Sequence, residues 1–224
     1  MADPNHFIIC SHGFGTAKDD RGLFPDAIAL VSGAEIIMFD YGIVDSVHNT
    51  VTVAPLSEQE KKLDEVITQT RNINPDAVID LVCHSMGCVT AALLKPVGIR
   101  KTLFLAPPYH LDGKRILDRF GRNPKTIMNR NGTSILARAD GTSTIMPKEF
   151  WDEAAGQDCI PLYNSFANLT EVEIVNAKQD NVLGDQGAVI LSPKIHIVNI
   201  DGNHGFTDDA RAPLRKVAAE FLTP

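Results

Sequence analysis

The sequence predicts an α/β fold, a three-layer αβα sandwich in which a mostly parallel six-stranded sheet lies between two layers of helices. Three observations support this prediction. Six short apolar runs rich in Val, Ile and Phe recur along the chain, and helical patterns separate them. Near-continuous apolar runs are typical of strands in a parallel sheet that is covered on both faces. The length of 224 residues suits one compact domain over 1–224 with a large core.

Each predicted strand is a mainly apolar run, and a polar or glycine-containing segment after it marks its end. Because strands and helices alternate, the crossover connections are expected to be right-handed. Ligands of such sheets bind at the carboxyl ends of the strands. The predicted strands span residues 7–10, 35–40, 77–83, 101–105, 172–177 and 194–200.

Helices are predicted from capping residues and from apolar side chains at helical spacing. Ser57 lies three residues before Glu60, which is the capping-box pattern at a helix start, and Asn74-Pro75 ends that helix before the third strand. A second helix of small residues is predicted over 87–94. The last helix begins at Asp208-Asp209 and directs an apolar side inward. That side consists of Leu214, Val217, Ala218 and Phe221.

One excursion, about 107–171, interrupts the alternation after the fourth strand. Segments 133–137 and 142–146 flank Asp140-Gly141, which predicts a β-hairpin, and Pro147 is typical of a helix start. No Gly/Ser-rich linker brackets the excursion, so it is interpreted as a cap-like insertion in a single domain.

Composition and charge exclude several classes of protein. The 21 Lys and Arg against 28 Asp and Glu give a net charge of −7, which would repel nucleic acid and anionic lipid and disfavours highly anionic substrates. No apolar stretch approaches the roughly 18 residues of a membrane span, and no basic-then-apolar leader is present, so a cytoplasmic protein without a membrane partner is expected. The four cysteines lack zinc-site spacing and are interpreted as reduced, buried thiols.

No other motif indicates a metal or a cofactor. Asp19-Asp20 and Asp208-Asp209 lack metal-ligand spacing with His and are interpreted as solvated or helix-capping residues. No G-x-G-x-x-G or P-loop follows a strand, so no nucleotide cofactor is expected.

The third predicted strand ends in Cys83-His84-Ser85-Met86-Gly87. A Ser at a sharp strand-to-helix turn has a strained backbone and an exposed hydroxyl. The segment resembles the nucleophile elbow of the α/β-hydrolase superfamily, G-x-S-x-G, with Cys83 in place of the first Gly. The alternative is an ordinary serine that caps the helix which follows the strand.

The first predicted strand ends in His12-Gly13-Phe14-Gly15, which resembles the oxyanion loop of the same superfamily. The resemblance implies that the N–H groups of Phe14 and Met86 form an oxyanion hole, and that His12 and Gly13 lie beside the substrate. The alternative is a tight glycine turn that His12 caps.

The resemblance also implies an acid and a base. Asp180 follows the fifth strand, where the superfamily places its triad carboxylate, and Asp185 is the second choice because it lies farther along the loop. His204 follows the sixth strand between Asn203 and Gly205 and matches the catalytic histidine. The chain order of Ser85, Asp180 and His204 is the one expected for this fold. An ordinary His pKa predicts an acid limb of activity with a midpoint of about 6 to 7.

A serine nucleophile implies acyl transfer. We therefore expect a compact serine hydrolase, a carboxylesterase that cleaves a small carboxylic ester or thioester through an acyl-enzyme without cofactor or metal. Tyr109 and His110 in the excursion are expected to line the substrate pocket. Two alternatives remain open: an acyltransferase or C–C hydrolase on the same triad, and a non-catalytic ligand-binding relative.

Overall fold

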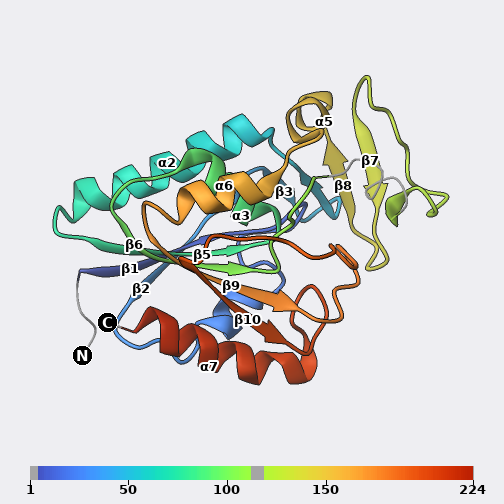
Figure 1. Ribbon diagram of the computed structural model, residues 1–224. Coiled ribbons are helices and arrows are strands. Elements are labelled where there is room, and N and C mark those ends of the chain that lie inside the picture. The colour runs from blue at the N-terminus through green and yellow to red at the C-terminus, as the bar shows by residue number, and fades with distance from the viewer. Residues whose placement is uncertain (1–4, 112–118, 224) are drawn as a thin grey trace.

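The computed structural model describes residues 5–111 and 119–223. Its main sheet has the strand order β10-β9-β6-β5-β1-β2, and every neighbouring pair is parallel (Figure 1). The six predicted strands are therefore confirmed, each with its ends within about two residues of the expected positions. The strands are β1 (His6–Ser11), β2 (Glu35–Met38), β5 (Val78–His84), β6 (Ile99–Leu105), β9 (Glu171–Ala177) and β10 (Ile195–Ile200).

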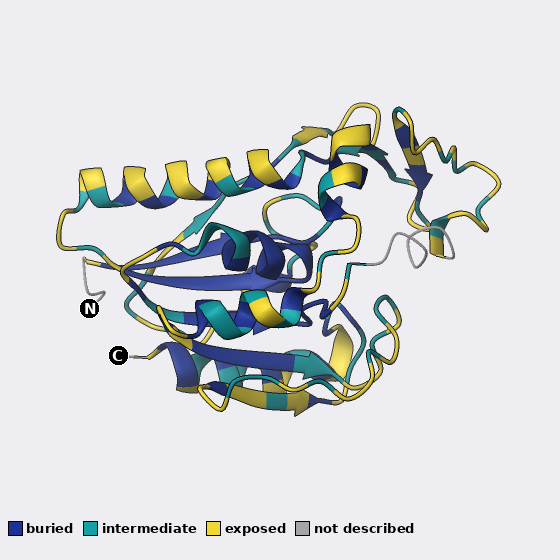
Figure 2. Ribbon diagram, turned by 45° about the horizontal axis from the view of Figure 1, so that its top comes forward, coloured by how far each residue is buried: buried dark blue, intermediate teal, exposed yellow. Residues whose placement is uncertain are grey.

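Helices cover both faces of this sheet, which confirms the three-layer αβα sandwich (Figure 1). One layer consists of α2 (Leu56–Ile73), α3 (Met86–Leu94) and α6 (Cys159–Phe166). The other layer consists of α1 (Leu23–Ala27) and α7 (Arg211–Leu222). Figure 2 shows that α2 is buried along the side that faces the sheet and exposed along the opposite side.

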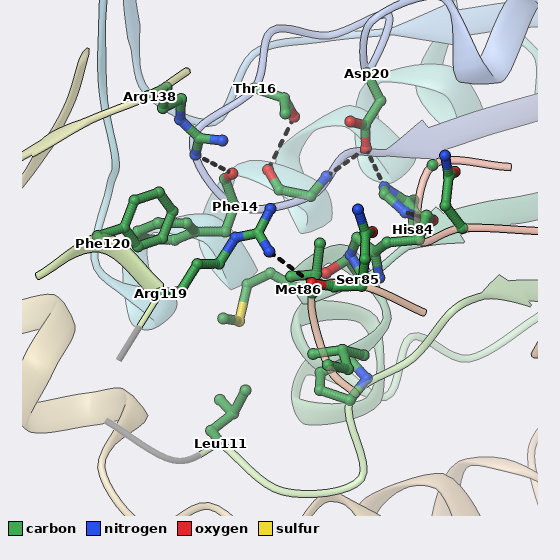
Figure 3. A pocket seen from close by; sticks show the side chains of 18 of the residues that line it. Phe14, Thr16, Asp20, His84, Ser85, Met86, Leu111, Arg119, Phe120 and Arg138 are labelled. Atoms are coloured by element: carbon green, nitrogen blue, oxygen red, sulfur yellow. Dashed lines mark hydrogen bonds and ion pairs between the residues drawn. The ribbon is translucent and has the colours of Figure 1, made fainter. Parts of the chain in front are cut away.

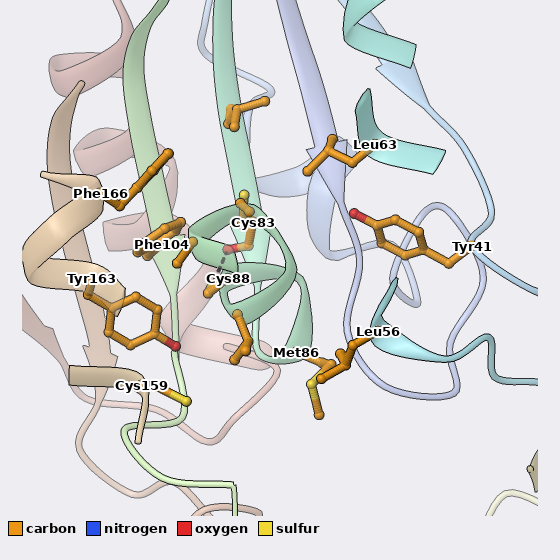
Figure 4. Packing of buried hydrophobic residues seen from close by; sticks show 14 of the residues in the cluster. Tyr41, Leu56, Leu63, Cys83, Met86, Cys88, Phe104, Cys159, Tyr163 and Phe166 are labelled. Carbon is orange, nitrogen blue, oxygen red and sulfur yellow. Dashed lines mark hydrogen bonds between the residues drawn. The ribbon is translucent and has the colours of Figure 1, made fainter. Parts of the chain in front are cut away.

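The core is divided into two clusters by the sheet. Successive side chains of a strand point to opposite faces, so Phe7 and Ile9 of β1 join the cluster under α2 and α3, while Ile8 and Cys10 join the cluster under α1 and α7. Both faces are buried, which explains why the strands read as continuous apolar runs. Figure 4 shows Cys83 and Cys88 in the first cluster beside Phe104. All four cysteines are buried and unpaired, as expected.

A second sheet with the order β3-β4-β8-β7 lies beside the main one (Figure 1). The predicted hairpin is confirmed: β7 (Ser134–Ala137) pairs antiparallel with β8 (Ser143–Met146). Strand β8 also pairs with β4 (Thr50–Thr52), which pairs with β3 (Ile43–Asp45). The excursion is thus joined to segment 43–52, although its residues 112–118 lie outside the described part of the chain.

The capping-box prediction at Ser57 is wrong. Helix α2 begins at Leu56 after Pro55, and the residue before the helix makes no side-chain cap. Ser57 lies in the first turn, where its hydroxyl donates to Glu153 of α5 (Lys148–Ala154) at 2.8 Å. A tertiary hydrogen bond to the excursion has taken the place of the local cap. The last helix does begin with Asp208, in a 3-10 turn over Asp208–Ala210 that leads into α7.

No helix in the described residues has both the length and the apolar character that crossing a membrane requires.

Candidate active site

The predicted site residues meet at the carboxyl edge of the main sheet, as parallel strands require. Gly13 follows β1, Ser85 follows β5, and His204 follows β10, and all three line one cavity of about 340 Å³. Phe14 and Met86, the predicted oxyanion residues, line the same cavity. Figure 3 shows Phe14, Ser85 and Met86 close together within it.

Ser85 occupies a strained turn between β5 and α3. Its φ is 52° and its ψ is −117°, a combination that costs a residue with a Cβ about 1–3 kcal/mol. Its side chain makes no cap bond to α3, so the alternative of an ordinary capping serine does not describe this position. The conformation leaves the hydroxyl free of the helix that follows it.

Gly87 lets the turn pass close to β1. A Cβ at this position would lie 2.1 Å from the carbonyl oxygen of Ser11, so the position accepts only glycine without a shift of backbone. Cys83 stands where the family pattern has its other glycine. It lies inside β5, fully buried and paired with β1 and β6, where a small side chain fits the sheet.

His204 and Asp180 form a hydrogen-bonded pair. The Nδ1 of His204 donates to Asp180 Oδ2 at 2.7 Å, which leaves Nε2 as the nitrogen that can accept a proton. The other carboxylate oxygen accepts the N–H groups of Val182 and Leu183 at 2.8 and 2.7 Å. Asp185 instead accepts the N–H of Gly187. Between the two predicted acids, Asp180 is the one that contacts His204.

The two pKa shifts of this pair suit a neutral base and an ionised acid. Burial raises the pKa of Asp180, but the hydrogen bond and charge of His204 and the two backbone N–H groups outweigh it, so the pKa is lowered. Burial lowers the pKa of His204 below its usual value of 6.5, and the positive charge of His84 adds to this effect against the opposing contribution of Asp180.

A second buried His–Asp pair, which the sequence interpretation missed, lies beside the first, and Figure 3 shows its two members, Asp20 and His84. His84 Nδ1 donates to Asp20 Oδ2 at 2.6 Å, and His84 Nε2 donates to the carbonyl oxygen of His204 at 3.0 Å. The rings of His84 and His204 are 4.8 Å apart between centroids. Asp20 is buried, so its interpretation as a solvated or helix-capping residue is wrong.

The charged form of His84 is favoured because both ring nitrogens face acceptors. Burial lowers its pKa, but the charge of Asp20 and the hydrogen bonds to Asp20 and to the His204 carbonyl outweigh burial, so the pKa is raised. The same Asp20 oxygen accepts the N–H of Gly13 at 2.7 Å. One carboxylate oxygen therefore ties the loop after β1 to the loop that carries His204.

Replacing Asp20 by Asn is expected to lower kcat by about 10- to 100-fold with a smaller change in KM, because losing a buried charged acceptor costs about 1–3 kcal/mol and displaces both loops. Steady-state kinetics on an activated ester measure the effect. Asp19→Asn is the matched control, since the side chain of Asp19 accepts only the N–H of Gly22 among the hydrogen bonds of the described chain. An equal loss in both variants would contradict a positioning role for Asp20.

The loop after β1 is fixed on both sides of the Phe14 N–H. The Gly13 carbonyl accepts from Thr16 Oγ1 at 3.1 Å, and the Phe14 carbonyl accepts from Arg138 Nη2 at 2.9 Å. A planar trans peptide directs its N–H opposite to its C=O, so the first bond also orients the Phe14 N–H. Within residues 5–111 and 119–223, neither this N–H nor that of Met86 has a hydrogen-bond acceptor.

Of the residues expected to contact substrate, Gly13 and His110 line the cavity and His12 and Tyr109 do not. His12 accepts the N–H of Tyr41 through Nε2 at 3.1 Å and donates from Nδ1 to the Gly13 carbonyl at 2.9 Å. This bond agrees with the alternative in which His12 secures the glycine turn. Tyr109 is buried and donates to Asn176 Oδ1 at 2.9 Å.

Comparison with known proteins shows the fold. No protein-family model and no curated protein sequence matches the chain. Among solved structures, Est1E from Butyrivibrio proteoclasticus is similar at 16% identity with a TM-score of 0.67, over 97% of this chain and 86% of that one. The structure of Est1E with bound ferulic acid gives 15% identity and a TM-score of 0.71, over 99% and 92% of the two chains.

An esterase from Pyrococcus furiosus is also similar, at 15% identity with a TM-score of 0.62, over 97% of this chain and 81% of that one. At such low identity the likeness concerns the fold, and this chain has the α/β-hydrolase fold.

Proposed function

We propose that this protein is a serine hydrolase that cleaves a small carboxylic ester or thioester through an acyl-enzyme on Ser85. The observation that carries the proposal is the meeting of three independent parts at one cavity. These parts are the strained Ser85, the hydrogen-bonded His204 and Asp180, and the two N–H groups of Phe14 and Met86. The similar structure from Pyrococcus furiosus, which is named as an esterase, agrees with this class of reaction.

In the proposed mechanism, His204 Nε2 takes the hydroxyl proton as Ser85 Oγ attacks the ester carbonyl carbon. The negative oxygen that forms is stabilised by the N–H groups of Phe14 and Met86. His204 then gives the proton to the leaving alcohol or thiol as its bond to the acyl carbon breaks. Water repeats the sequence on the acyl-enzyme and releases the acid. Asp180 orients the ring and stabilises its charged form.

We propose that the excursion 107–171 acts as a cap over this site. Trp151 from α5, Arg138 from the β7–β8 hairpin and Phe120 line the cavity together with the loops of the main sheet. Phe150 is fully buried and packs on Phe14, with 5.2 Å between ring centroids. This contact joins the cap to the loop after β1. The cavity volume of about 340 Å³ suits a small substrate.

A fluorophosphonate probe tests the proposal, because it reacts only with an activated serine. Labelling of the whole protein should map to the peptide that contains Ser85, and an ester substrate should slow it. The same protein should hydrolyse 4-nitrophenyl esters of graded acyl length. Absence of both labelling and turnover, with binding of a small molecule retained, would favour the non-catalytic alternative. Transfer to an added alcohol in preference to water would favour an acyltransferase.

The pH profile of kcat/KM should fall on the acid side with a midpoint below 6.5. The base must be neutral to accept the proton, and burial together with the charge of His84 lowers the pKa of His204, so activity persists to lower pH than an ordinary histidine allows. The profile should be measured with a neutral ester, so that no ionisation of the substrate contributes over the pH range of the measurement. A midpoint at or above 6.5 would contradict the lowered pKa of His204.

A further inference from the structure

The cavity has a local charge opposite to that of the whole chain. Its only lining carboxylate among the described residues is Asp20, whose Oδ2 is already bound to His84 and to the Gly13 N–H. The chain as a whole carries a net charge of −7. Yet five arginine side chains line this cavity, namely Arg21, Arg119, Arg130, Arg138 and Arg211.

Two of these arginines have carboxylate partners. Arg21 pairs with Asp140 at 2.9 Å, and Arg211 lies 3.6 Å from Asp26. Asp26 also pairs with Arg215 at 2.9 Å, so it offsets the charge of Arg211 only in part. The side chains of Arg21 and Arg211 are therefore held by the surrounding protein.

The other three arginines have no carboxylate within ion-pair distance in the part of the chain that the structure describes. Arg119 Nη1 donates to the carbonyl oxygen of Asn181 at 2.8 Å. The Arg130 guanidinium lies 4.9 Å from the ring centre of Trp151. Arg138 donates to Thr144 Oγ1 and to the Phe14 carbonyl at 2.7 and 2.9 Å.

Arg138 is the most constrained of the three. Its guanidinium lies 5.9 and 5.4 Å from the ring centres of Phe14 and Phe120, and Figure 3 shows it beside the Phe14 carbonyl. Burial lowers the pKa of Arg138 to about 10, and the charges of Arg21 and Arg119 add to this effect against the opposing charges of Asp140 and Asp20. The group stays charged at neutral pH. A partly buried cation without a carboxylate at ion-pair distance is costly, and an anion in the cavity would lower that cost.

We propose that the natural substrate is an ester that carries an anionic group, a carboxylate or a phosphate, which Arg119, Arg130 and Arg138 bind while Ser85 attacks the ester carbonyl. The inference rests on the proposed hydrolase function. Guanidinium groups bind both anions through paired, charge-assisted hydrogen bonds. The three arginines come from the cap side of the cavity, and Figure 3 places the Arg119 guanidinium between Phe120 and Ser85. The cap thus selects the substrate by charge.

Matched ester pairs test the proposal and show which part of the substrate carries the charge. For the alcohol part, 4-acetoxybenzoate and 4-acetoxyphenyl phosphate are compared with neutral methyl 4-acetoxybenzoate. For the acyl part, the 4-nitrophenyl monoester of adipic acid is compared with its methyl ester. In at least one pair the anionic ester should have a kcat/KM at least about tenfold higher, and the preference should fall as salt is raised.

Arg119→Gln and Arg130→Gln are the informative variants, because Arg138 also holds the Phe14 carbonyl. Each should lower the ratio of anionic to neutral kcat/KM at least about threefold, and the double variant should lower it further, because Arg138 alone of the three remains. Arg122→Gln is the matched control, an exposed arginine of the same segment that does not line the cavity. Its ratio should stay near that of the unmodified protein.

The possible failures are distinguishable. Turnover of neutral esters at least as fast as of anionic ones, with unchanged ratios in both variants, would overturn the anionic substrate and leave the hydrolase in place. An equal drop in Arg122→Gln would show that the overall positive charge of the segment, and not direct binding, favours the anionic ester. This result would also overturn the anionic substrate. Absence of turnover on every ester, together with no fluorophosphonate labelling, would overturn both proposals.

Discussion

Replacing Ser85 with alanine is expected to abolish fluorophosphonate labelling and to lower kcat on activated esters by about 10⁴- to 10⁶-fold, because loss of a triad nucleophile leaves only binding and oxyanion stabilisation. The fold should be retained, since Ala keeps the Cβ and Ser85 caps no helix. Circular dichroism and thermal unfolding check this. Turnover within tenfold of the unmodified protein would contradict Ser85 as the nucleophile.

Replacing Ser85 with glycine distinguishes the cost of the strained backbone from the loss of the hydroxyl. Ser85 has φ 52° and ψ −117°, a backbone that only glycine adopts without cost. Both variants lack the hydroxyl, and only Ser85→Ala keeps the strained Cβ. Ser85→Gly should therefore unfold with a free energy about 1 kcal/mol higher than Ser85→Ala, after the entropic cost of glycine is deducted. Equal free energies from urea unfolding would show that the turn is not strained.

Gly87→Ala is expected to lower the free energy of unfolding by about 3 kcal/mol or more, because two backbone segments would have to separate. The added Cβ would lie 2.1 Å from the carbonyl oxygen and 2.6 Å from the carbonyl carbon of Ser11. Ser11 cannot turn away freely, since its hydroxyl donates to the Gly87 carbonyl at 3.0 Å and lies 2.6 Å from the Tyr41 hydroxyl.

Gly205→Ala is the control for this variant. A Cβ at Gly205 would meet its nearest neighbours at 3.8 Å, which is ordinary contact, and the expected loss is below about 1 kcal/mol. Urea unfolding of both variants measures the difference. A Gly87→Ala protein as stable as the unmodified one would show that β1 and α3 can move apart.

The main sheet was predictable because both of its faces are buried. Ile8 and Ile9 of β1 belong to different core clusters, so each strand is apolar throughout and is recognised without an alternating pattern. Strands β3 and β4 escaped prediction for the opposite reason. Each has three residues and is partly exposed, and so short a segment carries no readable period.

The candidate site was predictable only where residues lie next to a strand end. Ser85, Asp180 and His204 each follow a strand, and the sequence order points to them. Asp20 and His84 contact one another across 64 positions of sequence, and nothing local marks Asp20 as buried. The cavity arginines come from several distant segments, so their convergence is a property of the fold that the net charge conceals.

The shared oxygen of Asp20 has a consequence for redesign of this scaffold. This oxygen accepts the Gly13 N–H and His84 Nδ1, and His84 in turn donates to the backbone of His204. The segments at the carboxyl ends of β1, β5 and β10 therefore depend on one another for their positions. A loop transplanted from another protein into positions 13–20 would need an acid at the same point, or His84 would lose its counter-ion. Redesign of this fold by recombination should therefore exchange the three segments together.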